Sequence, residues 1–111
     1  MNSEFYNFEI NTAKGLAYVQ APEQLIGGRE TLDLTKLFAD LTHNVHSFVI
    51  ELSKVHVINS SGLGTLILAH RTLSEREIKL FLMNPSDKVK EIIKITHLDK
   101  IFSIISDLSE I

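Results

Sequence analysis

The hydrophobic and polar positions of this chain follow the two-residue repeat of strands in some segments and the longer repeat of helices in others. Residues 5–10, FYNFEI, and residues 15–21, GLAYVQA, predict two strands, and the turn-like NTAKG that joins them predicts a hairpin. Pro22 ends the second strand, because proline has no N–H to donate to a sheet. The segment PEQLIGGRE that begins there is expected to be a loop.

A helical repeat begins at Arg29. Its apolar residues recur at spacings of three and four, which places them on one side of a helix, and they are Leu34, Leu37, Phe38, Leu41 and Val45. Residues 47–52, SFVIEL, are nearly all apolar and predict a central strand that is buried on both faces. VHVI, residues 55–58, is expected to continue or extend that strand.

The second half of the chain repeats this alternation. We expect a second helix from about Ser61 to Ser74, a buried strand over residues 78–84 and a third helix from Ser86 to about Thr96. Pro85 suits the first turn of the third helix. Residues 100–105, KIFSII, predict a last short strand before a brief C-terminal helix or tail. The apolar sides of the two helices consist of Leu63, Leu66, Ile67 and Leu73 in the first and of Val89, Ile92, Ile93 and Thr96 in the second.

The expected order of elements is therefore β-β-α-β-α-β-α-β. Strands that alternate with helices build a largely parallel sheet with right-handed crossovers, and the opening hairpin adds antiparallel pairing at one end. We predict a single α/β domain over residues 1–111, with a mixed sheet of four to five strands and with helices mainly on one face.

Composition and charge exclude several classes of protein. The chain has no cysteine, which excludes disulfides, thiolate zinc sites and cysteine catalysis. It has no apolar run near the roughly 18 residues of a membrane span, and its N-terminus lacks the basic start and apolar run of a secretion signal. Its 11 basic residues are scattered among 14 acidic ones, so we expect no nucleic-acid partner. These features predict a cytoplasmic protein without membrane insertion.

The stretch INSSGLGTLILAH, residues 58–70, carries the candidate chemistry. An apolar strand breaks at Asn59, Ser60 and Ser61, and we expect Asn59 or Ser60 to cap the helix that follows, because a side-chain oxygen there accepts a free backbone N–H. Gly62 and Gly64 are not explained by capping, since glycine weakens a helix by roughly 1 kcal/mol relative to alanine. They leave the first turns bare, so a ligand or a partner can reach the backbone.

Three functions could use such a helix start. Phosphate binding is weakly indicated, because GLGTLI has only G-x-G and the lysine of a P-loop is absent. A nucleophilic serine is disfavoured, because INSSG is not the G-x-S-x-G elbow and no histidine and acid partners can be assigned. His43 and His46 lack a third ligand at a matching spacing, so no metal site is expected either. The third possibility is a serine that a partner modifies, since a phosphate on Ser60 adds about −1.5 to −2 charges at pH 7.

Residues 48–73, FVIELSKVHVINSSGLGTLILAHRTL, resemble the core signature of STAS domains, specifically the bacterial anti-sigma factor antagonists. The family pattern is an apolar strand, a few residues, and then Asp-Ser-Ser-Gly-Leu-Gly at the start of a helix. Residues 78–105, IKLFLMNPSDKVKEIIKITHLDKIFSII, resemble the same family in their strand, their NPS junction and their T-x-L-x-K-I-F segment. The resemblance is close over residues 47–105 and covers the first 46 residues only in the order of elements.

The resemblance implies a mechanism of partner switching. Such antagonists bind an ATP-dependent anti-sigma factor that is also a serine kinase, and they thereby release a sigma factor. The kinase inactivates the antagonist by phosphorylating the first serine of the motif, here Ser60, and a phosphatase reverses the reaction. The partner-binding residues around it would be Asn59, Ser61, Gly62, Leu63 and Gly64. The chain would be a substrate and a ligand, with no catalytic residue, metal or cofactor of its own.

The chain departs from the family pattern at two places. Asn59 replaces the aspartate of the motif, so it keeps the capping oxygen and loses the charge. The family's Gly-x-x-Asp after the second strand is absent from APEQLIGGRE, where Glu23 or Glu30 could substitute. Two alternatives follow. One is a STAS subunit that docks on another complex, such as a lipid-transport ATPase or a signalling scaffold. The other, of a different class, is a small nucleotide-binding protein.

Overall fold

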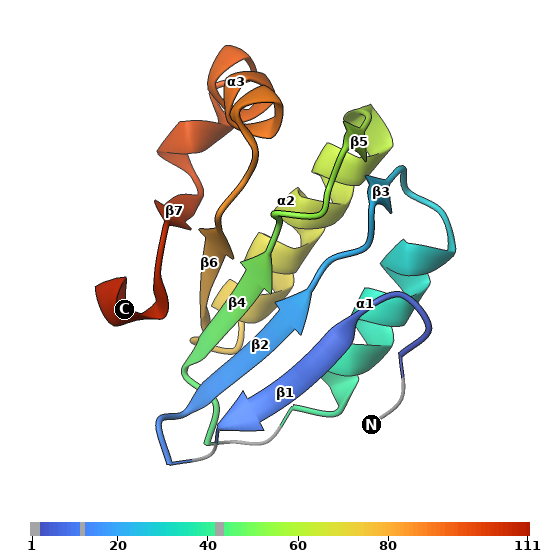
Figure 1. The fold of residues 1–111 in the computed structure, drawn as a ribbon. Coiled ribbons are helices and arrows are strands. Elements are labelled where there is room, and N and C mark those ends of the chain that lie inside the picture. Colours follow the sequence, from blue (N-terminus) through green and yellow to red (C-terminus); the bar gives the residue numbers. More distant parts are fainter. Residues whose placement is uncertain (1–2, 12, 42–43) are drawn as a thin grey trace.

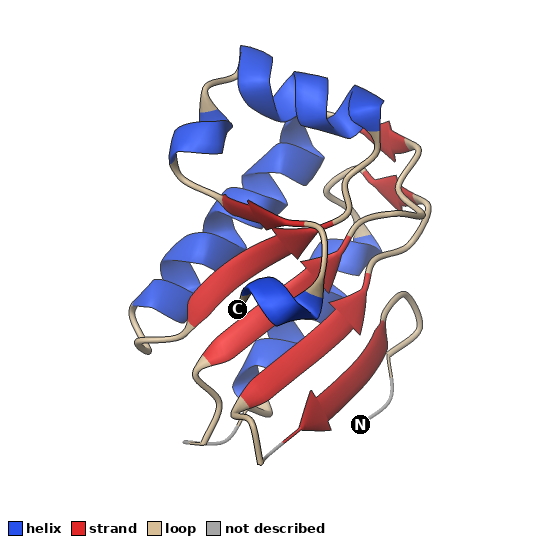
Figure 2. Ribbon diagram, turned by 60° about the vertical axis from the view of Figure 1, so that its left-hand side comes forward, coloured by secondary structure: helices blue, strands red, loops and turns tan. Residues whose placement is uncertain are grey.

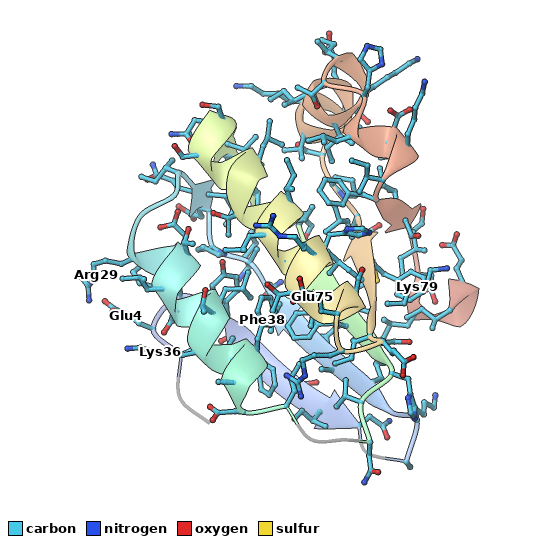
Figure 3. The ribbon with its side chains drawn as sticks, turned by 180° about the vertical axis from the view of Figure 1, so that it is seen from behind. Glu4, Arg29, Lys36, Phe38, Glu75 and Lys79 are labelled. Atoms are coloured by element: carbon cyan, nitrogen blue, oxygen red, sulfur yellow. The ribbon has the colours of Figure 1, made fainter. Side chains whose placement is uncertain are left out.

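The computed structural model describes residues 3–11, 13–41 and 44–111. A five-stranded sheet in the order β1-β2-β4-β6-β7 forms its centre, with α1 and α2 on one face (Figures 1 and 3). The strands of this sheet are β1 (Asn7–Asn11), β2 (Leu16–Gln20), β4 (Ser47–Glu51), β6 (Lys79–Met83) and β7 (Ser103–Ile105). The helices are α1 (Arg29–Ala39), α2 (Ser60–Ser74) and α3 (Asp87–Ile95), and the short 3₁₀ turns are η1 (Leu98–Lys100) and η2 (Leu108–Glu110).

The sheet is mixed, as predicted. β1 pairs antiparallel with β2 as the expected hairpin, and the other three pairings are parallel. Alternate residues face opposite sides of such a sheet, so Ala17 and Val19 of β2 face α1 and α2 and are fully buried. Leu16 and Tyr18 face the other side, which η2 crosses (Figure 2). None of the described helices is long and apolar enough to cross a membrane.

Helix α1 ends earlier than its apolar repeat predicts. It stops at Ala39, although Leu41 and Val45 are also buried. The guanidinium of Arg76 donates hydrogen bonds to the carbonyl oxygens of Phe38 and Leu41, at 2.6 and 3.0 Å. These carbonyls therefore have a partner outside the helix, and the described residues that follow, Leu41 and Val45, contribute to the core from outside a helix.

Two short segments, one before α1 and one before α2, form a small second sheet that the sequence did not predict. β3 (Gln24–Leu25) lies in the expected loop and pairs in parallel with β5 (Val57–Ile58). β5 is thus a separate strand and does not extend β4, because residues 53 and 54 turn the chain away. The pairing fixes the loop after β2 beside the residues that lead into α2.

The predicted apolar sides of the helices are correct except at their margins. Ile67 of α2 was expected to face inward but is 40% exposed, and Ala69 is buried instead. Thr96 was placed on the apolar side of α3, but it is exposed and ends the helix. Pro85 precedes the N-cap Ser86 and does not lie in the first turn.

The last predicted strand is shorter than expected. Only Ser103–Ile105 forms β7, because residues 98–100 form η1. The prediction of a brief C-terminal helix or tail corresponds to the single 3₁₀ turn η2.

Candidate functional site

The candidate site lies where β5 ends and α2 begins. Asn59 is the N-cap of α2, and its Oδ1 accepts the backbone N–H of Gly62 at 2.8 Å. Its backbone N–H donates to the carbonyl of Leu25, and its side-chain amide donates to the carbonyl of Ile26 at 3.4 Å. Asn59 therefore caps the helix and also holds its first turn against the segment after β3.

The two serines of the motif are both exposed. Ser60 is the first residue of α2 and Ser61 is the second. The hydroxyl of Ser60 makes no hydrogen bond to any residue that the structure describes. It projects from the positive end of the helix dipole, where an added negative charge is tolerated.

Two glycines are needed for close packing at this point. A Cβ on Gly62 would overlap the carbonyl oxygen of Leu25, and a Cβ on Gly27 would overlap the side chain of Ser61. Gly27 also has a φ of +81°, which other residues rarely adopt. Gly62 and Gly27 therefore allow the segment after β3 to lie directly against the first turn of α2.

Gly64 has no such structural role. It is exposed, and a Cβ built on it would meet no atom within 4 Å. The fold would accept alanine there, although glycine weakens a helix by about 1 kcal/mol relative to alanine. The bare backbone at Gly64 is thus available to a partner that approaches closely.

Ser60 begins an exposed face of α2 that includes apolar side chains. Gly64, Ile67 and Leu68 follow Ser60 at spacings of four, seven and eight, which places all four on one side of the helix. Ile67 and Leu68 are 40% and 37% exposed. The apolar pattern had placed Ile67 on the inward side and gave no role to Leu68, although the helical repeat counted from Ser60 places both on the exposed face.

The adjoining small sheet adds two more exposed apolar residues. Ile26 follows β3 and Val57 begins β5, and both are more than two fifths exposed. We call the exposed residues at this helix start, on the helix face that follows it and on the small sheet the Ser60 surface, and they are Ile26, Val57, Asn59, Ser60, Ser61, Gly64, Ile67 and Leu68. Leu63, which the motif had assigned to partner binding, is buried, as is Gly62. These two residues therefore contribute to the packing under the Ser60 surface and are not part of the surface itself.

The two acids that could substitute for the family's aspartate lie in different environments. Glu30 is buried, and its Oε1 accepts the backbone N–H groups of Ile26 and Gly27 at 2.7 Å and that of Gly28 at 3.1 Å. Burial acts to raise the pKa of this carboxyl, but the backbone hydrogen bonds outweigh it and lower the pKa from its ordinary value. Glu30 therefore shapes the loop, and Glu23, which is exposed, is the acid that a partner can reach.

The histidines offer no alternative site within the described part of the chain. No group of three His, Asp or Glu side chains there is placed to hold a metal ion. His43, one of the two closely spaced histidines, lies outside the described residues, and His46 is exposed. His70 packs edge-on against the ring of Phe102, with 6.2 Å between the ring centroids, and so belongs to the packing of α2.

Known proteins resemble this chain in family and in fold. The STAS domain family model matches residues 7–111. An anti-sigma factor antagonist from Mycobacterium paratuberculosis has a TM-score of 0.77 and 20% identity, over 95% of this chain and 87% of that one. The anti-sigma factor antagonist SpoIIAA in its unphosphorylated form has a TM-score of 0.65 and 16% identity, over 95% and 90%. A sulfate transporter family protein from Wolinella succinogenes has a TM-score of 0.76 and 14% identity, over 86% and 80%.

Proposed function

Because the chain belongs to the STAS domain family, we propose that it is an anti-sigma factor antagonist that binds its partner through the Ser60 surface and is switched off by phosphorylation of Ser60. The observation that carries the proposal is the exposed Ser60 at the first residue of α2, on a helix face that also carries the exposed apolar side chains of Ile67 and Leu68. Two of the solved structures that share the fold are described as anti-sigma factor antagonists. In this role the chain is a ligand and a substrate, and it acts in the cytoplasm as one domain.

The switch follows from where the phosphate would lie. A phosphoserine carries about −1.5 to −2 charges at pH 7. In the free protein this charge would sit in water at the positive end of α2, which favours an anion. In a complex it would be buried against apolar surface, and burial of an unpaired charge is costly. Phosphorylation would therefore leave the fold intact and weaken only the complex.

The expected partner is an ATP-dependent anti-sigma factor that phosphorylates serine. SpoIIAA is described in its unphosphorylated form, which supports phosphorylation as the switch proposed for this chain. Here Asn59 provides the capping oxygen that the family's aspartate would provide, and it does so without a charge. Phosphoryl transfer to Ser60 would thus not use a carboxylate at position 59. A serine phosphatase would restore binding.

A second function uses the same surface without the modification. The sulfate transporter family protein from Wolinella succinogenes shares the fold at a TM-score of 0.76. A STAS domain that serves as a docking subunit of a transport or signalling complex would bind through the same Ser60 surface. In that case Ser60 would not be phosphorylated.

A phosphorylation assay distinguishes the two functions. The full chain is incubated with the anti-sigma factor kinase of the same genome and labelled ATP. We expect one phosphate on Ser60 and its complete loss in Ser60→Ala. Ser74→Ala is the matched control, because Ser74 is exposed at the other end of α2. Transfer that survives Ser60→Ala would contradict the proposed switch.

A binding measurement tests the surface itself. Ser60→Asp should weaken the complex with the anti-sigma factor about ten-fold or more, since each ~1.4 kcal/mol is a factor of ten. Ser74→Asp adds the same charge to the same helix and should leave the affinity unchanged. Equal affinity of the two variants would show that the partner binds elsewhere on the molecule.

A further inference from the structure

The sheet has a groove on the face that α1 and α2 leave uncovered. Its volume is about 750 Å³, within the roughly 300–1,000 Å³ of small-molecule sites. The strands supply Glu9, Leu16, Tyr18 and Met83, and Leu108 of η2 supplies the opposite wall. η2 stands in front of the strands in Figure 2. We call this hollow the sheet groove.

The walls of the sheet groove are mostly apolar and are preformed. Val49, Phe81, Met83 and Ile105 form a second apolar cluster, separate from the main core, against which Leu16 and Tyr18 pack. η2 is fixed by a capping box, in which Asp107 accepts from the backbone of Ser109 and Glu110 accepts from the backbone of Asp107. Leu108 is nevertheless 41% exposed, because the groove in front of it is open.

A smaller and more polar hollow continues the sheet groove. It has a volume of about 430 Å³ and shares Asn11, Leu16 and Leu108 with the larger one. Lys14, Ser47 and Ser109 line it, and Lys14 forms no ion pair with any described residue. Asn11, Lys14, Ser47 and Ser109 are thus the polar residues at this end of the channel, where Ile111 also lines the wall.

The charges fix how an occupant would lie. Glu9 lines the groove together with Tyr18, and burial raises the pKa of the Tyr18 phenol, as do the nearby carboxylates of Glu51 and Glu9. An anionic group is therefore unfavourable at the Tyr18 end and favourable at the Lys14 end. The shape selects a slender occupant, because η2 stands above the sheet and prevents a flat surface from reaching the floor.

We propose that this channel binds a single-chain amphiphile with a carboxylate head, of the fatty-acid class. The carboxylate accepts hydrogen bonds from Lys14 and its polar neighbours, and the hydrocarbon chain lies on Leu16, Tyr18 and Met83 behind Leu108. Charge complementarity at Lys14 and the apolar walls beyond it argue for this occupant. The site lies across the sheet from α1 and α2 and does not depend on the proposed function of Ser60.

The fluorescence of Tyr18 provides the assay. The chain has two tyrosines and no tryptophan, and the other tyrosine is Tyr6. The Tyr6 hydroxyl is buried without a hydrogen-bond partner in the described structure, so Tyr6→Phe keeps the packing and leaves Tyr18 as the single fluorophore. Titration of Tyr6→Phe with sodium dodecanoate below its micellar concentration should change the Tyr18 emission and saturate.

Two further substitutions, made in this background, test the two ends of the channel. Lys14→Gln should weaken dodecanoate binding about five- to ten-fold, as expected for the loss of a charge-assisted hydrogen bond. Leu108→Ser should weaken it by a similar factor. Lys36→Gln and Leu32→Ser are the matched controls, because both residues are exposed on α1 on the other side of the sheet (Figure 3). The controls should bind as the background does.

Several results would overturn the proposal. If dodecyltrimethylammonium bound with the same affinity as dodecanoate, the site would not require an anionic head group. An unchanged affinity in Lys14→Gln or in Leu108→Ser would show that dodecanoate binds elsewhere, as would no saturable response of Tyr18. Sedimentation of the ligand-free protein tests whether a second copy fills the groove, and a dimer that Leu108→Ser dissociates would replace the amphiphile as its occupant.

Discussion

Gly62 and Gly64 are two residues apart in α2, but only one of them is required by the fold. A methyl group at Gly62 would overlap the carbonyl oxygen of Leu25, whereas one at Gly64 would meet nothing within 4 Å. Gly64→Ala should therefore raise the free energy of unfolding by about 0.5–1 kcal/mol, the intrinsic helix preference of alanine. Gly62→Ala should lower it instead. Urea unfolding followed by circular dichroism measures both.

Gly64→Ala also tests the Ser60 surface. If a partner lies directly on the backbone at Gly64, the more stable Gly64→Ala variant should bind that partner less tightly. A variant with higher stability and unchanged affinity would show that the partner does not approach this position. If Gly64→Ala does bind less tightly, the loss of affinity cannot be attributed to damage of the fold, because the substitution strengthens the helix.

At the scale of elements, Glu30 holds the loop between β3 and α1. Its carboxylate accepts three backbone N–H groups, and its pKa is lowered from the ordinary value of 4.5. The unfolded chain therefore binds a proton more readily than the folded one at this group, so the stabilisation is present above pH 4.5 and is lost as the pH falls through the lower folded value.

Glu30→Gln should remove this pH dependence. The variant should be less stable than the parent at pH 7, and the difference should shrink as the pH falls below the ordinary value of 4.5. Glu23→Gln is the control, because Glu23 is exposed near the same loop. Thermal unfolding between neutral and acidic pH measures the effect, and parallel curves for Glu30→Gln and the parent would contradict the assigned role.

Arg76 ends the first helix from a distant part of the chain. Its guanidinium donates to the carbonyls of Phe38 and Leu41, and a positive charge at a helix C-terminus also interacts favourably with the dipole. Arg76→Ala should lower the free energy of unfolding by about 1 kcal/mol. Arg71→Ala, on the exposed face of α2, should change it by less, and equal losses in chemical unfolding would argue against a capping role.

At the scale of the whole molecule, the sequence predicted what local patterns determine and missed what distant segments determine. The apolar repeats gave the three helices and the strands of the main sheet. The pairing of Gln24 with Val57 and the contacts of Arg76 with α1 join residues more than thirty positions apart, and no local repeat marks them. The site follows the same rule. The motif indicated Ser60 and its cap Asn59, whereas Ile26 became part of the surface only through the β3–β5 sheet.

The two proposed binding sites lie on opposite sides of the main sheet, and this arrangement predicts that they act independently. Substitutions that share no partners usually add to within about 0.3–0.5 kcal/mol. In the Tyr6→Phe background, Ser60→Asp should therefore change dodecanoate affinity by no more than about two-fold. Lys14→Gln should likewise leave phosphoryl transfer to Ser60 unchanged. A larger effect of either substitution on the other site would mean that the sheet couples them, and the amphiphile would then be a regulator of partner binding.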